Sequence, residues 1–199
     1  VMGSFSFKGV SRKVSKLKTF KRKASALANQ KFLREKKKLI ANFEGHPVTQ
    51  ELRGGINAPN LSRTLPGGYG NLFSFIGFEQ SSDPVDVIRD ALDSTKIQKN
   101  PKKQIKNERV LFRFVIDYPT LYELKTVTRM PWEAGLSWLD RIEKGISGFG
   151  YYMQTQSRRF SRSGGGVQLD KKVRSGGYSP VSYYSGIINK FKKGIIRGK

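Results

Sequence analysis

Apolar residues between positions 10 and 43 recur at steps of three, four or seven, which is the spacing of one face of an α-helix. Gly45, His46 and Pro47 follow, and glycine and proline commonly come after the last helical turn. The pattern therefore predicts one long amphipathic helix with the apolar stripe Val10, Val14, Leu17, Phe20, Ala24, Leu27, Ala28, Phe32, Leu39 and Phe43.

After this helix, the pattern predicts a loop followed by a strand. Residues 47–70 contain Gly-Gly, Ala-Pro and Pro-Gly-Gly-Tyr-Gly, which are typical of turns. The run Asn-Leu-Phe-Ser-Phe-Ile-Gly-Phe at 71–78 is apolar and short, and we interpret it as a strand with a bulge at Gly77. No Lys-Ser or Lys-Thr follows the glycines at 67, 68 and 70, so this is not a phosphate-binding loop.

The middle of the chain alternates between helical and extended patterns. A short helix is expected after Asp83-Pro84, with Ser82 or Asp83 as its N-cap and an apolar stripe that includes Ile88 and Leu92. The basic segment 96–106 is expected to be an exposed loop. Residues 109–118 are rich in β-branched and aromatic side chains and predict a strand, and residues 120–128 predict a short helix or turn.

The last third contains one ambiguous segment and one of low complexity. Residues 132–146 favour a helix, because Leu139, Ile142 and Ile146 have helical spacing, although residues 137–142 also suit a strand. Residues 148–180 are aromatic, basic and rich in Gly and Ser, as in a mobile loop or an element ordered by a partner. The end of the chain predicts an amphipathic helix with the apolar residues Tyr184, Ile187, Ile188, Phe191, Ile195 and Ile196.

These segments predict an α+β fold with a long basic N-terminal helix and a small antiparallel sheet carrying one or two packed helices. We divide the chain into a basic N-terminal helical arm (1–46), a small α+β core (47–147), a Gly/Ser/Arg/Tyr-rich loop (148–180) and a C-terminal amphipathic helix (181–199).

Charge is the most informative part of the composition. The 199 residues include 38 Lys and Arg against 15 Asp and Glu, which gives a formal net charge of +23. Such an excess predicts an anionic partner: nucleic acid, an acidic protein surface or, less often, a membrane. The candidate contacts to DNA or an acidic partner are Lys13, Lys16, Lys21, Arg22, Lys23, Lys36, Lys37, Lys38, Arg158, Arg159 and Arg162.

The sequence offers little to catalysis. His46 is the one histidine, there is no cysteine, and Asp83, Asp86, Asp90 and Asp93 are expected to form the polar face of a short helix. We therefore expect no enzyme, no metal and no cofactor. No run approaches the roughly 20 apolar residues of a membrane span, and the N-terminus lacks the apolar core of a signal peptide.

The loop 148–180 mixes Tyr151, Tyr152, Phe160 and Tyr178 with several arginines. Aromatic rings and cations together suit contacts to a nucleic-acid backbone and bases, and they equally suit a contact between subunits. No zinc-finger spacing, RNP-like aromatic pair or KH loop is present, so any contact to nucleic acid is expected to be directed at the backbone.

The order of motifs resembles the neck and tail-completion proteins of tailed bacteriophages. It consists of a basic N-terminal helix, HPVTQEL with a Gly-rich turn, NLFSFIGF and a short DPVDVIRDAL helix. The resemblance covers residues 10–146. In that class SWLDRIEKGISG matches a sheet segment that ends in an acidic residue and Gly, here Glu143 and Gly145, which implies a strand at 137–146. Residues 148–180 depart from the compact core of the class.

The resemblance implies a structural virion protein of the neck or tail, synthesised in the host cytoplasm. It implies a homo-oligomeric ring, commonly of six or twelve copies, around the DNA channel and against neighbouring neck and tail proteins. The candidate subunit-interface residues are Phe73, Phe75, Phe78, Trp132, Trp138, Tyr151 and Tyr152.

The alternative is a general nucleic-acid-binding protein with basic tails, such as a ribosome-associated or DNA-packaging protein. The charge suits both classes. The apolar segments NLFSFIGF and RVLFRFVIDY, with Trp132 and Trp138, provide more apolar surface than such a binder needs and favour the virion protein.

Overall fold

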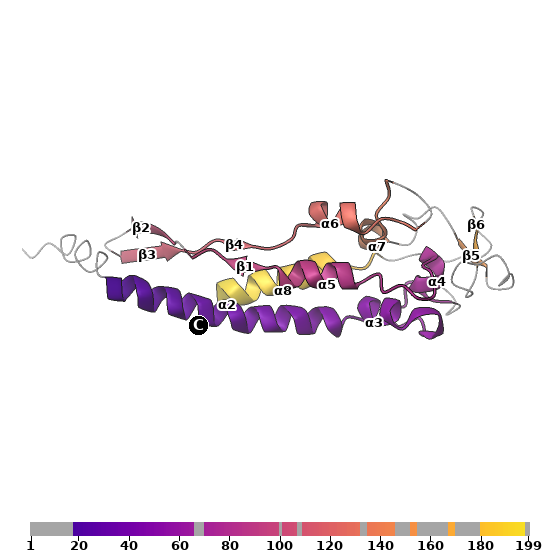
Figure 1. The fold of residues 1–199 in the computed structure, drawn as a ribbon, viewed down its shortest axis with the longest axis horizontal. Coiled ribbons are helices and arrows are strands. Elements are labelled where there is room, and N and C mark those ends of the chain that lie inside the picture. Colours follow the sequence, from indigo (N-terminus) through magenta and orange to yellow (C-terminus); the bar gives the residue numbers. More distant parts are fainter. Residues whose placement is uncertain are drawn as a thin grey trace, which may run out of the picture.

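The computed structural model describes residues 18–65, 70–99, 101–106, 109–131, 135–145, 152–154, 167–169 and 180–197. The molecule is elongated, and one long helix runs along most of its length (Figure 1). The described strands form three separate two-stranded antiparallel ribbons, so the predicted α+β class is confirmed. The strands do not join into one sheet covered by helices.

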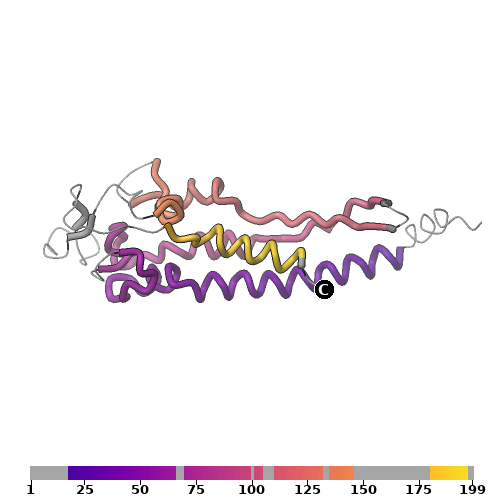
Figure 2. Tube along the Cα trace, turned by 180° about the vertical axis from the view of Figure 1, so that it is seen from behind, coloured from indigo at the N-terminus to yellow at the C-terminus, as the bar shows by residue number. Residues whose placement is uncertain are grey.

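The long helix α2 (Lys18–Glu44) confirms the predicted helix over its described part; residues 10–17 lie outside the described residues. Its buried apolar residues are Phe32, Leu39 and Phe43, whereas Phe20 and Leu27 of the predicted stripe are exposed. Helix α8 (Tyr184–Arg197) packs beside α2, with the rings of Phe32 and Phe191 6.5 Å apart. Figure 2 shows that α8 ends beside the middle of α2.

The chain turns at His46 directly into a second helix, α3 (Pro47–Arg53), where a loop was predicted. The His46 Nδ1 accepts a hydrogen bond from the Val48 N–H at 3.2 Å, and Pro47 occupies the first helical turn. The prediction was wrong because Val48 and Leu52 lie on one face, four residues apart, and are fully buried. A 3₁₀ turn, η1 (Gly55–Asn57), follows.

The predicted strand at 71–78 is wrong, since the segment forms the helix α4 (Leu72–Ile76). Asn71 caps it: its Oδ1 accepts from the Ser74 N–H at 2.9 Å. Gly77 ends it in the left-handed conformation, with φ of 82°, and is therefore a helix C-cap and not a strand bulge. Every residue from Leu72 to Ile76 is buried, so the segment shows no alternation that separates helix from strand.

Helix α5 (Asp86–Asp93) confirms the predicted short helix, with Ile88 and Leu92 buried. The predicted N-cap, Ser82 or Asp83, is wrong: Val85 precedes the helix without a side-chain cap, and Asp83 accepts from the Val85 N–H at 3.1 Å in the turn before it. The predicted loop at 96–106 is wrong. It contains β1 (Lys96–Ile97) and β2 (Lys102–Lys106), which pair with β4 (Ile116–Asp117) and β3 (Arg109–Arg113). The predicted strand at 109–118 is thus confirmed as β3 and β4, in a ribbon that runs beside the first half of α2 (Figure 1).

Two short helices follow the ribbon. α6 (Leu121–Val127) begins with a capping box between Thr120 and Glu123. α7 (Trp138–Lys144) begins at the cap Ser137 and confirms the helix favoured for 132–146. The strand that the phage resemblance implies at 137–146 is wrong, because Trp138, Leu139 and Ile142 follow the i, i+1, i+4 spacing of a buried helix face.

The end of the chain closes the core. Tyr184, Ile187, Ile188 and Phe191 of α8 are buried as predicted, whereas Ile196 is 80% exposed and its predicted burial is wrong. Of the segment 148–180, the backbone of β5 (Tyr152–Gln154) and β6 (Val167–Leu169) is described, and they pair antiparallel.

The side chains predicted to form a subunit interface instead build this chain's own core. Phe73, Phe75, Phe78 and Trp138 are at most 6% exposed, and Phe78 packs edge-on against Trp138 with ring centroids 5.8 Å apart. A side chain without accessible surface has nothing to offer a second subunit, so the interface prediction is wrong for these four residues. Trp132 and Tyr151 lie outside the described residues, and only the backbone of Tyr152 is described.

Candidate functional site: the basic end of the molecule

Positive charge gathers at one end of the long axis. This basic end consists of residues 18–34 of α2 and residues 96–113 of the ribbon, which lie side by side (Figures 1 and 2). The rings of Phe20 and Phe112 join them at 5.8 Å. The described part of these two segments contains no carboxylate, and its cations are Lys18, Lys21, Arg22, Lys23, Lys31, Arg34, Lys96, Lys99, Lys102, Lys103 and Arg113.

The carboxylates gather further along the rod, where they form ion pairs. Glu44 at the end of α2 contacts Arg53 of α3 and Arg89 of α5, the latter at 3.1 Å. Arg53 also reaches Asp83 at 3.1 Å. Burial disfavours the charged guanidinium of Arg53, but the hydrogen bonds to Glu44 and Asp83 outweigh it and raise the pKa. These ion pairs join α2, α3 and α5, and they neutralise most of the charge of the side chains that form them.

A hollow of about 470 Å³ lies between α2 and the ribbon within the basic end. Ile97 and Phe114 contribute apolar surface, and Arg22 and Lys99 contribute cations. Ser25, Ala26, Asn29 and Gln98 complete the lining. The hollow therefore offers positive charge and hydrogen-bonding groups beside an aromatic ring, a combination that suits an anionic and partly apolar ligand.

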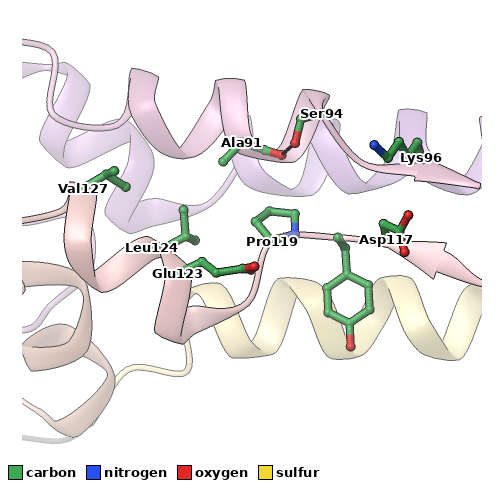
Figure 3. A pocket seen from close by; sticks show the side chains of 9 residues that line it. Ala91, Ser94, Lys96, Asp117, Pro119, Glu123, Leu124 and Val127 are labelled. Carbon is green, nitrogen blue, oxygen red and sulfur yellow. Dashed lines mark hydrogen bonds between the residues drawn. The ribbon is translucent and has the colours of Figure 1, made fainter.

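A second hollow, of about 460 Å³, separates α5 from α6 (Figure 3). We call it the α5–α6 groove. Ala91, Pro119, Leu124 and Val127 give it apolar walls, and its polar residues are Ser94, Lys96, Asp117, Tyr118 and Glu123. The backbone N–H and side chain of Thr120 hydrogen-bond Glu123 and lower the pKa of its carboxyl group. Two carboxylates against one cation make this groove acidic, in contrast to the basic end.

The predicted cationic contacts fall into three groups. Lys21, Arg22 and Lys23 lie in the basic end, exposed, and no ion pair between described residues involves them. Lys36 donates to the Asp93 carbonyl and Lys38 pairs with Glu35 at 2.9 Å, whereas Lys37 is exposed. The remaining predicted contacts lie outside the described residues; they are Lys13, Lys16, Arg158, Arg159 and Arg162.

Sequence reasoning missed the cations of the ribbon, because residues 96–106 were interpreted as a loop. It also missed that Glu35, the only acid within the basic helix before Glu44, is buried. Its carboxylate accepts from Lys38 and from Arg34 at 3.2 Å, and Gly194 of α8 lies against it. The hydrogen bond from Lys38 outweighs burial and lowers the pKa of Glu35. The signal for this buried carboxylate in the sequence is a single acidic residue among lysines.

The described residues contain no group of three or more His, Asp or Glu that is arranged to hold a metal ion. His46 serves as a helix cap beside Tyr183, with ring centroids 4.8 Å apart, and burial lowers its pKa. Among the described helices, none is long and apolar enough for a membrane span.

The described geometry therefore offers two surfaces, a basic end and an acidic groove, on an elongated molecule. Comparison with known proteins gives no match to this chain among protein-family models, curated proteins or solved structures.

Proposed function

We propose that this chain is a structural virion protein of a tailed phage. In this proposal it forms a ring, of six or twelve copies, in the neck or tail around the DNA channel. The basic end faces DNA or an acidic neighbouring protein, and the subunit has no catalytic role. The order of sequence motifs suggests this class, although the strand expected at 137–146 is a helix.

The observation that carries the proposal is the separation of charge along the rod. The basic end has cations on two elements and no described carboxylate, whereas the carboxylates near α3 and α5 are paired with Arg53 and Arg89. Among the described residues, no ion pair involves Lys21, Arg22 or Lys23 of the basic end, whereas Arg34 at its inner limit pairs with Glu35. An external anion would neutralise the remaining excess of positive charge. The phosphate backbone of DNA provides such a surface without sequence recognition.

A shared core supports the structural role. Buried side chains from α2, α4, α5, α7 and α8 form one cluster, so the basic end is anchored on a packed body. A nucleic-acid binder dominated by disordered basic tails needs no such body. An elongated subunit with opposite charge character at two surfaces is also suited to repeated contacts between copies.

The test combines assembly with binding. Purified protein is examined by light scattering and negative-stain microscopy at low and high salt, and binding to a DNA duplex is measured over a salt series. We expect closed rings and DNA binding that weakens as salt rises. A monomer that binds DNA or RNA under all conditions would instead establish the general nucleic-acid-binding alternative.

Two double variants with the same change in charge test whether DNA binds at the basic end. Lys21→Glu with Lys23→Glu alters the basic end, and Lys190→Glu with Lys193→Glu makes the same charge change on exposed positions of α8. The first variant should reduce the slope of log affinity against log salt by about 2, since each lost phosphate contact contributes about 0.9. Equal losses from both variants would show that net charge, and not this surface, governs binding.

A further inference from the structure

The ribbon at the basic end has two unlike faces. Side chains directly opposite each other on paired strands share a face, and Lys102 pairs with Arg113 while Gln104 pairs with Leu111. Phe112 and Phe114 belong to the other face, which meets α2 through Phe20 and the hollow. The outward face of the ribbon is therefore Lys102, Gln104, Leu111, Arg113 and Val115.

This outward face is both basic and apolar. Leu111 is 45% exposed and Val115 is 38% exposed, and Arg113 lies between them on the same face. DNA phosphate accounts for the cations but gives no reason for two exposed aliphatic side chains in a ribbon. A protein surface with apolar walls and carboxylates matches both properties.

The α5–α6 groove has the complementary character. Val127 is 52% exposed at its wall, and Val87 on the outer face of α5 is also exposed, one turn before Ala91. Asp117 and Glu123 provide carboxylates, and Asp90 adds another on α5, without an ion pair among the described residues. Lys96 is the cation at one end of the groove (Figure 3).

Within one chain, the β2–β3 part of the outward face lies away from the α5–α6 groove. The paired strands β2 and β3 lie at the far end of the rod, while α5 and α6 lie beyond its middle (Figures 1 and 2). Lys96 of β1 and Asp117 of β4 line the groove, and β2 and β3 continue from them towards the end of the rod (Figure 1). A contact between the β2–β3 part of the outward face and the groove must therefore join two copies.

We propose that the outward face of the ribbon docks in the α5–α6 groove of a second copy. Leu111 and Val115 cover the apolar walls, and Lys102 and Arg113 approach Asp117, Glu123 and Asp90. The two surfaces differ, so the contact is heterologous and joins copies head to tail, as a closed ring requires. This inference rests on the proposed ring and assigns the contact that builds it. DNA then meets the α2 side of the basic end.

The absence of cysteine from the 199 residues allows a direct test in this chain. One chain carries Gln104→Cys on the outward face, and a second, distinguished by a mass tag, carries Val127→Cys in the groove. Both positions are exposed and neither substitution removes a charge. The chains are mixed in equal amounts under conditions that allow assembly, oxidised, and separated without reductant. The control replaces Gln104→Cys with Lys103→Cys, its neighbour on the opposite face of the strand, and the test chain also carries Lys103→Gln so that both chains have the same charge.

We expect the disulfide between positions 104 and 127 to exceed the control by about tenfold, because disulfides require Cα atoms within about 7 Å. Equal yields from both pairings would overturn the docking. If the wild type forms rings while the yields are equal, the proposed ring stands and this contact is wrong. If the wild type stays monomeric at every salt concentration and no disulfide exceeds the control, both proposals fall.

Discussion

Glu51 shows how much one buried side chain organises in this protein. It is fully buried on α3, and its two carboxylate oxygens accept hydrogen bonds from the Ser62 and Leu72 N–H groups, each at 2.7 Å. One acceptor pair thus fixes the loop after η1 and the start of α4. Asn71 adds three contacts from its Nδ2 to the carbonyl groups of Gly55, Ile56 and Ala58.

Glu51→Gln should destabilise the protein although its volume is nearly unchanged. The amide retains one acceptor oxygen and turns an N–H group towards the second backbone N–H. An unsatisfied buried donor costs about 1–3 kcal/mol, so the free energy of unfolding should fall by about that amount. Urea unfolding measures it, with the exposed Glu79→Gln as a control expected within about 0.5 kcal/mol of wild type. Equal stability of both variants would contradict this role.

His46 gives the protein a pH dependence of definite sign. Burial lowers its pKa, with a smaller contribution from Lys190, while the Tyr183 ring packs against it. The unfolded chain therefore binds the proton first as pH falls. The stabilising effect of neutral His46 is complete above about pH 6.5 and is lost below it, by at most about 1.4 kcal/mol per pH unit.

The variant His46→Asn tests this dependence, because asparagine also caps helices and does not titrate. Between about pH 7.5 and 5.5, the free energy of unfolding of the wild type should fall more than that of the variant. Parallel curves for the two proteins would assign the acid sensitivity to other groups.

At the scale of single residues, the sequence shows which side chains are present, but it does not predict which of them are buried. The sequence shows His46 before Pro47, but it does not show that the His46 side chain caps α3. Glu35 and Glu51 were not recognised, because their burial depends on partners 11 to 159 positions away, such as Ser62, Leu72 and Gly194. A local pattern contains no information on these long-range contacts.

At the scale of elements, length and periodicity decided which predictions succeeded. The helices α2, α5 and α8 have apolar residues that recur over two turns or more, and each was predicted. The segments at 47–53 and 72–76 form only one or two turns, and their neighbours bury them on several sides. The β2 strand was missed because its lysines suggest a loop, while its pairing with β3 is what makes it a strand.

The crossing of α2 and α8 predicts a strong dependence on one glycine. A Cβ on Gly194 would overlap the Glu35 carboxylate, which is buried and held by Arg34 and Lys38. Moving that carboxylate disturbs its ion pairs, so the close approach favours glycine. Gly194→Ala should lose about 1–2 kcal/mol more stability than the control Gly186→Ala.

The control lies in the same helix, and a Cβ added there would meet only the Ser182 side chain, with the hydroxyl oxygen 3.1 Å away. Both variants gain about 1 kcal/mol of helix propensity, so their difference reports the crossing. Thermal unfolding followed by circular dichroism measures this difference. If Gly194→Ala were more stable than Gly186→Ala, α2 and α8 would be able to move apart without a loss of stability, and the prediction would be wrong.

At the scale of the whole molecule, repulsion between cations is the dominant electrostatic feature. The formal net charge is +23, and the basic end has no described carboxylate to offset it. Raising the salt from about 0.05 to 0.5 M should increase Tm, because screening weakens this repulsion. The opposite effect on exposed ion pairs is smaller, since each contributes only about 0–1 kcal/mol.

The variant Lys21→Glu with Lys23→Glu lowers the formal net charge from +23 to +19 and should show a smaller rise in Tm with salt. Differential scanning calorimetry at matched protein concentration measures both proteins. A rise of the same size in both would place the repulsion outside the basic end.

The candidate site was partly predictable at this scale. The excess of Lys and Arg on α2 was visible in the sequence, and Lys21, Arg22 and Lys23 lie where an anion can reach them. That Lys99, Lys102 and Arg113 belong to the candidate site could not be predicted, because their positions depend on how the strands of the ribbon pair. The α5–α6 groove was not predictable, because its walls come from segments that meet only in the folded chain.

Helix α2 packs against α8 along one part of its length and against the ribbon along another, and this division affects how the molecule can bend. The helix contacts α8 near Glu35, and α8 ends beside the middle of α2, so that among the described elements it is the ribbon that lies beside the first half of α2 (Figure 2). Lys18 lies about 25 Å from this support, given a rise of 1.5 Å per residue. A tilt of about 10° there displaces the tip by about 4 Å. A small change in the angle of α2 at this support would therefore displace the basic end by a larger distance, and in the proposed ring it would change the width of the DNA channel.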